Sequence, residues 1–241
     1  MKQFLMTDLC SVNFHLMCRV GSQAAVNKVG AAMGMILGKI TVETPKYKSL
    51  EKKEDIEIRE YDSAVVAEVT YDPKTMKSGR DGGFMILAGY IGAIGTPCNK
   101  KGSEPGEKIA MTAPVITQEH GGAEKIAMTA PVITKEEDGG EAKNGMVTMQ
   151  FVLPSNYTLE TAPTPTDDRV KLKEFPNKTY GVITFSGTAN SKLEEQQLQK
   201  LRSSLETDGY KIVGPHLLAR YNPPWTPWFL KTNEVMIPVE K

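Results

Sequence analysis

From Ile40 onward, hydrophobic and polar residues alternate with a period of two along much of the chain. The first clear stretches are Ile56–Tyr61 and Ala64–Tyr71, with Asp62 and Ser63 between them. This alternation is typical of β-strands that bury one face, and the two polar residues suit a turn. The sequence therefore predicts an antiparallel strand pair turned at Asp62 and Ser63.

A longer apolar stretch follows at Gly82–Ile94. It is apolar on most sides, which fits either a buried helix or a pair of strands. Its length exceeds that of a typical buried strand, although Gly89 and Gly92 each weaken a helix by up to ~1 kcal/mol. We therefore expect a helix here.

The second half shows the same kinds of element without the same sequence. Val147–Leu153 is predicted as a strand, and Val170–Phe175 and Tyr180–Ser186 predict a second strand pair. Tyr210–Tyr221 and Glu234–Val239 predict two more strands near the end of the chain.

The strongest helix signal lies between these strands. Ser191 and Glu194 have the spacing of a capping box, in which a hydroxyl and a carboxylate bond the unpaired amides at a helix start. One apolar stripe is formed by Leu193, Leu198, Leu201 and Leu205. Gly209 suits a left-handed C-cap that would end this helix.

A strand pair, a helix and further strands therefore occur twice, in the same order. Each apolar face named above is buried if the two sets of strands curl together with one helix outside each set. We expect an α+β fold, a distorted antiparallel β-barrel of two pseudo-symmetric halves, each with one flanking helix.

The segment EKIAMTAPVIT occurs twice, at Glu107–Thr117 and Glu124–Thr134. The unit is too short for a solenoid repeat, which needs roughly 20 to 50 residues, so it is a local duplication. Pro114 and Pro131 lack a backbone N–H, so each copy should be an edge strand or bend at its proline. Two interpretations stay open, a duplicated hairpin arm in a surface insertion and a functional rim.

Residues 1–32 do not follow the pattern of the rest, so residues 33–241 are predicted to form the domain. The apolar residues of the 1–32 segment are interrupted by Asp8, Asn13 and His15, which excludes a transmembrane helix. No signal-peptide cleavage pattern is evident in this segment. A disordered tail, or a start upstream of the natural one at Met33, is favoured over a plastid or mitochondrial presequence. A cytoplasmic protein is expected, with a plastid as the alternative.

The charges balance, with 29 basic and 29 acidic side chains. This balance removes the long-range field that non-specific nucleic-acid binding needs. Cys10, Cys18 and Cys98 are odd in number and unsuitably spaced for a disulfide framework or a zinc site, which favours a reducing compartment. The sequence contains no nucleophile elbow, phosphate loop or His-Glu-x-x-His motif, so we expect no enzyme activity.

Several short motifs, in order, carry a resemblance to a known family. They are IREYDSAVVAEV, GYIGA, the two KIAMTAPVIT copies and LLARYNPPWTPWFLKTNEVMIPV. Over Met33–Lys241 the chain resembles the SOUL haem-binding protein family, specifically its plant-like cytosolic members. The resemblance implies a tetrapyrrole carrier or buffer, binding haem or protoporphyrin in an apolar groove beside the first helix, on a fold shared with small-molecule effector-binding domains.

A porphyrin needs an apolar wall of adaptable side chains and cations for its two propionates. Candidates for the wall are Phe84, Met85, Leu87, Ala88 and Ile91, with Met111 or Met128 opposite and Trp225 at the mouth. An apolar helix is also the usual composition of a core. Candidates for the rim are Arg80, Arg220 and Lys231. Where animal members of the family have basic residues, this chain has Asp81 or Arg80, then Gly89, and Thr226.

Axial ligation of haem iron has little support in the sequence. His216 is the one histidine in a predicted strand, and such a histidine is more often structural than a ligand. We therefore expect binding without a protein ligand to the iron. The alternative function is a protein-interaction module that has lost tight haem binding and docks a partner through its Pro-Trp-Thr-Pro-Trp segment.

Overall fold

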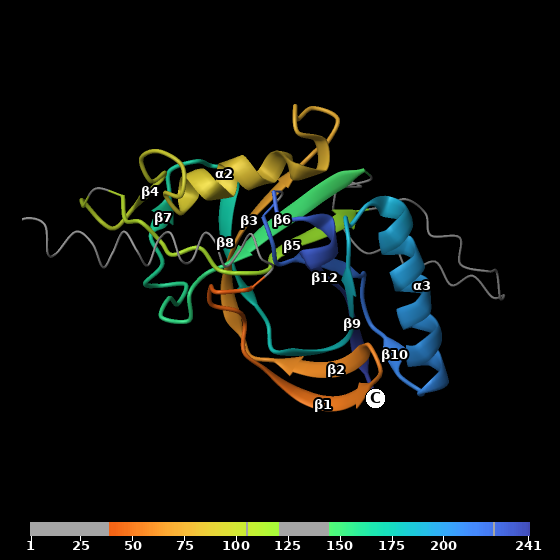
Figure 1. Cartoon of the computed structure of the whole chain (residues 1–241). Helices are drawn as coiled ribbons and strands as arrows, with labels where there is room; N and C mark the ends of the chain where they lie inside the picture. The colour runs from red at the N-terminus through yellow and green to blue at the C-terminus, as the bar shows by residue number, and fades with distance from the viewer. Residues whose placement is uncertain (1–38, 105, 121–144, 224) are drawn as a thin grey trace, which may run out of the picture.

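The computed structural model describes residues 39–104, 106–120, 145–223 and 225–241. Two helices, α2 (Gly82–Tyr90) and α3 (Ser191–Thr207), flank a curled antiparallel sheet (Figure 1). Short 3-10 turns, η1 (Gly79–Asp81) and η2 (Trp228–Leu230), precede α2 and the last strand. The predicted α+β fold is confirmed, as a curled half-barrel with two flanking helices.

Ten strands form the main sheet, in the order β1-β2-β9-β12-β11-β5-β6-β3-β8 with β10 beside β12. They are β1 (Tyr47–Lys53), β2 (Ile56–Tyr61), β3 (Ala64–Tyr71), β5 (Val115–His120), β6 (Met146–Val152), β8 (Val170–Phe175), β9 (Lys178–Ser186), β10 (Lys211–Ile212), β11 (Leu217–Arg220) and β12 (Thr232–Glu240). A separate pair is formed by β4 (Asn99–Lys100) and β7 (Thr164–Pro165), the latter inside a stretch without a predicted strand.

The strands of the two predicted pairs are present, but the predicted pairing between them is wrong. β2 does not pair with β3, and β8 does not pair with β9; instead β2 pairs with β9, and β3 pairs with β8. The connections at Asp62-Ser63 and Pro176-Asn177 thus carry the chain from one half of the sheet to the other. The prediction failed because alternation identifies the buried face of a strand and not its neighbour.

Three clusters of buried side chains divide the core. α2 packs on β3 and β6 around Met149, and α3 packs on β9 and β12 around Leu201. A third cluster, around Val182 and Met236, includes buried side chains from both halves of the sheet. Each helix therefore covers its own half of the sheet.

The start of α3 differs from the predicted capping box. Asn190, and not Ser191, is the N-cap residue, and its Oδ1 accepts a hydrogen bond from the Leu193 amide at 2.9 Å. Glu194 is buried and bonds Arg80, so its carboxylate does not close the box. The predicted end holds, because Gly209 follows the helix with a φ of +77°.

The first copy of the duplicated segment is neither an edge strand nor a surface arm. β5 begins directly after Pro114 and lies between β11 and β6, so the strand does not run through the proline and is not at an edge. Ile109, Ala113 and Ile116 of this copy are buried in the core. The second copy, including Met128, lies outside the described residues, as do residues 1–32. Among the described residues, no helix is long and apolar enough to cross a membrane.

Candidate functional site

The side chains predicted to form the porphyrin wall do not share one environment. Leu87, Ala88 and Ile91 are buried in the core between α2 and the sheet. Phe84 is half-buried, with its ring edge against Phe151 at 5.4 Å between centroids. Met85 is 56% exposed. In this structure most of the predicted wall therefore faces the protein interior, and Met85 is the member that solvent reaches most.

Two glycines explain why this face of α2 is closed. A Cβ atom on Gly83 would lie 2.6 Å from the Tyr71 ring and 2.8 Å from Val69 Cγ1. A Cβ atom on Gly82 would lie 2.5 Å from Met76 Cβ. The first turn of α2 can approach β3 this closely because it carries no side chains there. Leu87 and Ala88, in the next turns of the same helix, are buried.

Arg80 joins three elements at the start of α2. Its Nη2 lies 2.9 Å from Glu194 Oε2 in α3, and its Nε lies 2.5 Å from Glu119 Oε1 in β5. Burial opposes the charge of Arg80, but the bond to Glu194 and the two carboxylates outweigh it and raise the pKa of the guanidinium. A propionate at Arg80 would compete with two carboxylates already in place.

Arg220 is also engaged. Its Nη1 lies 2.6 Å from Asp81 Oδ1, and its Nη2 donates to Thr117 Oγ1 at 3.2 Å. Arg80 and Arg220 therefore bring the start of α2, β5 and β11 together. Lys231, the third predicted cation, is half-buried and directly follows η2.

His216 lies beside the same carboxylate as Arg80. Its Nε2 is 3.3 Å from Glu194 Oε1. Burial opposes ionisation of Glu194, yet hydrogen bonds from His216 and Arg80 lower the pKa of its carboxyl below the ordinary value. This arrangement gives His216 a structural contact, and binding without a protein ligand to the iron stays a prediction.

The exposed aromatic side chains gather near the C-terminal motif. Trp225 is 70% exposed, Trp228 is 66% exposed and Phe229 is 59% exposed. Trp228 and Phe229 meet edge to face with 5.8 Å between their ring centroids. Sequence reasoning named Trp225 for the porphyrin site and the Pro-Trp-Thr-Pro-Trp segment, which includes Trp228, for a protein partner, but it did not name Phe229. Met111, just ahead of β5, is 37% exposed.

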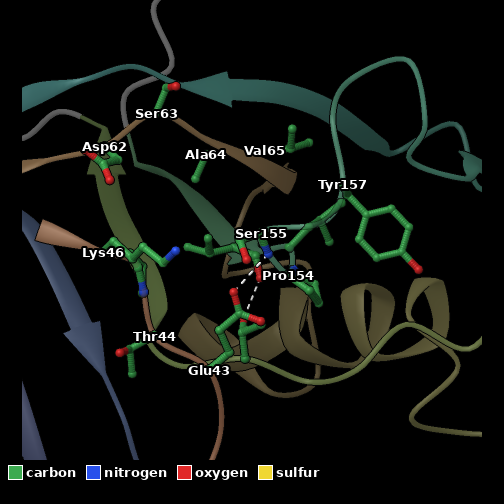
Figure 2. Close-up of a pocket in the computed structure, with 14 residues that line it drawn as sticks. Glu43, Thr44, Lys46, Asp62, Ser63, Ala64, Val65, Pro154, Ser155 and Tyr157 are labelled. Atoms are coloured by element: carbon green, nitrogen blue, oxygen red, sulfur yellow. Dashed lines mark hydrogen bonds between the residues drawn. The ribbon is translucent and has the colours of Figure 1, made fainter.

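A pocket of about 200 Å³ lies elsewhere, and Figure 2 shows it. Its walls come from the segment before β1, the β2–β3 connection and the end of β6, and they include Glu43, Lys46 and Tyr157. Glu43 accepts a hydrogen bond from the Ser155 amide at 2.9 Å, and bonds from Ser155 lower the pKa of its carboxyl. No predicted site residue lines this pocket. The sequence did not reveal the pocket because its walls come from segments that are far apart in the chain.

The pocket is too small to enclose a porphyrin. Sites that enclose drug-sized ligands measure roughly 300–1,000 Å³, against about 200 Å³ here. Within the described ranges, no group of three or more histidine, cysteine, aspartate or glutamate side chains could hold a metal ion. A porphyrin would therefore not be enclosed in this pocket.

A buried ionic cluster between β2 and β12 completes the polar interior. Arg59 Nη1 lies 2.9 Å from Glu234 Oε1, and Tyr221 donates to Glu234 Oε2 at 2.6 Å. Thr184 donates to the same carboxylate at 3.1 Å. Burial and the charge of Glu234 raise the pKa of Tyr221. These bonds use both oxygens of Glu234, so the cluster is structural.

Comparison with known proteins gives a family and a fold. The family described as SOUL heme-binding protein matches residues 42–123 and 117–238 of this chain. None of the curated proteins compared with the chain matches it. A solved structure of an uncharacterized conserved protein from Listeria innocua is similar, with 13% identity and a TM-score of 0.50, covering 78% of this chain and 93% of that one.

The C-terminal domain of EcmrR is also similar. It shows 14% identity and a TM-score of 0.49, and the match covers 81% of this chain and 98% of that domain. At 13% identity, the similarity to the Listeria innocua protein concerns the fold alone.

Proposed function

Because this chain belongs to the SOUL heme-binding protein family, we propose that it binds haem or protoporphyrin and acts as a non-catalytic tetrapyrrole carrier or buffer. The family match, which extends over both halves of the sheet, is the observation that carries this proposal. The proposed binding surface is the outer side of α2, where Met85 is exposed, together with the exposed side chains of Met111 and Trp225.

The geometry favours an open site for this ligand. Met85 and Met111 are exposed thioethers, which adapt to a flat apolar ring at low cost. Trp225 is also exposed, and the proposal assigns its aromatic face to the mouth of the site. An open site suits a carrier, since a ligand that is only partly covered can be released without unfolding its host.

The proposal includes Arg80, Arg220 and Lys231 as propionate partners. Arg80 and Arg220 already bond carboxylates, so a propionate gains only the difference between the new ion pair and the one it replaces. We therefore expect apolar contact to supply most of the affinity. With His216 held by Glu194, metal-free protoporphyrin should bind about as well as haem.

Substitution of Met85 tests the site directly. Met85→Asp places a charge on the exposed side of α2, and should weaken haemin binding at least about tenfold because a bound ring would desolvate the carboxylate. Leu50→Asp is the matched control, since Leu50 is also exposed but lies in β1, at the opposite edge of the sheet from the strands that α2 covers. Equal affinity of both variants and the wild type in a Soret titration would remove α2 from the site.

A second function is favoured by a different observation. Trp225, Trp228 and Phe229 together expose more aromatic surface than an isolated residue would, and clustered aromatics between prolines anchor protein interfaces. The alternative is a protein-interaction module on the same fold. Trp228→Ala should then abolish partner binding, whereas Met85→Asp should leave partner binding unchanged.

A further inference from the structure

β5 fills a position between β11 and β6 with residues that occur twice in the chain. Val115, Ile116 and Thr117 pair with Arg220, Ala219 and Leu218 on one side. The same three residues pair with Phe151, Gln150 and Met149 on the other side. The second copy carries Val132, Ile133 and Thr134 at the corresponding places.

The contacts ahead of the strand also come from duplicated residues. The Ile109 amide donates to the Ile91 carbonyl at 3.0 Å, and the Ala113 amide donates to the Glu43 carbonyl at 3.0 Å. Tyr157 donates to Glu107 Oε1 at 2.9 Å, and Thr112 bonds the Val152 carbonyl. Because Glu124–Thr134 is identical to Glu107–Thr117, it can make every one of these contacts.

The residues after each copy include a glutamate at the position that bonds Arg80. Glu119 bonds Arg80, and Glu136 has the same place after the second copy. Gln118 and His120 correspond to Lys135 and Glu137. Gln118 and His120 are only half-buried in the sheet, so polar replacements meet no closed apolar wall.

The residue just before each copy differs in a way that affects packing. Gly106 precedes the first copy, and a Cβ atom there would lie 2.7 Å from the Pro97 carbonyl oxygen and 2.8 Å from the Asn99 carbonyl oxygen. Ala123 precedes the second copy and carries that Cβ atom. Backbone atoms cannot move aside as a flexible side chain can, so the second copy fits less well. This is a physical reason for the first copy to occupy β5.

The connections permit either choice. With the first copy in place, residues 101–106 lead from β4 and residues 121–145 lead to β6. With the second copy in place, residues 101–123 and 138–145 would do so. One connection lengthens as the other shortens, and closure entropy changes slowly with length, so the two effects largely cancel. The two stretches of the family match also overlap at residues 117–123, from the last residue of the first copy to the residue before the second.

We propose that the sheet has two alternative conformations. In the first, Glu107–Thr117 leads into and forms β5, and in the second, Glu124–Thr134 takes its place. The first conformation predominates because of Gly106, and the second is a minor state. Exchange moves residues 107–123 from β5 and its following connection into the connection after β4. The chain thereby changes the loop beside the C-terminal end of α2 without changing its core.

The test uses a charge in β5 of the full chain. Ile116 is 2% exposed in the inner core cluster, where an unpaired carboxylate disrupts packing. Ile116→Asp should still show cooperative thermal unfolding, because the second copy takes over. Ile133→Asp should melt within about 2 °C of the wild type, and the double variant should show no cooperative transition. Val66→Asp puts the same charge into the same cluster without a duplicate, and it should behave like the double variant.

Amide hydrogen exchange locates the strand in each variant. The residues after each copy differ, so Gln118–His120 and Lys135–Glu137 are distinguishable. In Ile116→Asp, protection should move from the former to the latter. Adding Ala123→Gly should raise the melting temperature of Ile116→Asp, although alanine-to-glycine changes ordinarily lower stability. The proposal is overturned if Ile116→Asp unfolds like the double variant, if the double variant melts like the wild type, or if protection stays at Gln118–His120.

Discussion

Arg80 and Glu194 form an ion pair of 2.9 Å that links the start of α2 to the first turn of α3. The pair joins the two helices that cover different halves of the sheet (Figure 1). Glu194 is nearly buried, and His216 bonds its other oxygen. One carboxylate therefore bonds both Arg80 and His216 and links the two helices.

Glu194→Gln should lower the free energy of unfolding by about 1–3 kcal/mol at pH 7, because Arg80 then loses a charged partner in a largely desolvated place. Urea unfolding measures this difference. Glu195→Gln, on the exposed side of the same helix, should change it by less than about 0.5 kcal/mol. Equal effects of the two substitutions would contradict the assigned role of Glu194.

The contribution of Glu194 should depend on pH in a defined direction. Its folded-state pKa lies below the ordinary value of 4.5, so the stabilisation is complete above that pH and is lost as the pH falls through the folded-state pKa. Wild type and Glu194→Gln should therefore converge in stability only well below pH 4.5. A difference that is unchanged down to pH 2–3 would mean that ionisation of Glu194 is irrelevant.

Gly83→Ala should destabilise the fold by about 1–3 kcal/mol, because the added methyl group meets Tyr71 and Val69 at less than contact distance. Gly89→Ala is the matched control in the same helix, where the nearest atom is Cys98 Sγ at 3.7 Å. The control should be neutral or stabilising by up to about 1 kcal/mol. Thermal unfolding of both variants distinguishes close packing of α2 from simple helix propensity.

Asp81→Asn should tighten haemin binding about two- to fivefold at low salt, since it releases the Arg220 guanidinium for a propionate. Asp168→Asn removes the same charge just before β8 and should leave the affinity unchanged. Weaker binding by Asp81→Asn would show that Arg220 does not receive a propionate.

Local elements could be predicted from the sequence, but their partners could not. The stripe of Leu198, Leu201 and Leu205 placed α3 correctly, since helix periodicity is a property of neighbouring residues. The pairing of β2 with β9 depends on contacts between distant segments, and a period of two fits any neighbour. Asn190 was missed as the cap because Ser191 also suits that position.

The candidate site shows the same limit. α2 is apolar all round, so its sequence does not say which side faces the sheet, and Leu87 and Ala88 proved to be core residues. The ion pairs of Arg80 and Arg220 join segments far apart in the chain, so their engagement was not visible in the sequence. The pocket beside Glu43 was missed for the same reason.

The central claim is tetrapyrrole binding, and titration of the full chain with haemin and with metal-free protoporphyrin tests it most directly. Soret absorbance and tryptophan fluorescence follow the two ligands independently of any enzyme assay. We predict saturable one-to-one binding of both, with dissociation constants in the micromolar range or below and within about tenfold of each other, which corresponds to about 1.4 kcal/mol. Absence of saturable binding by either ligand would contradict the carrier function.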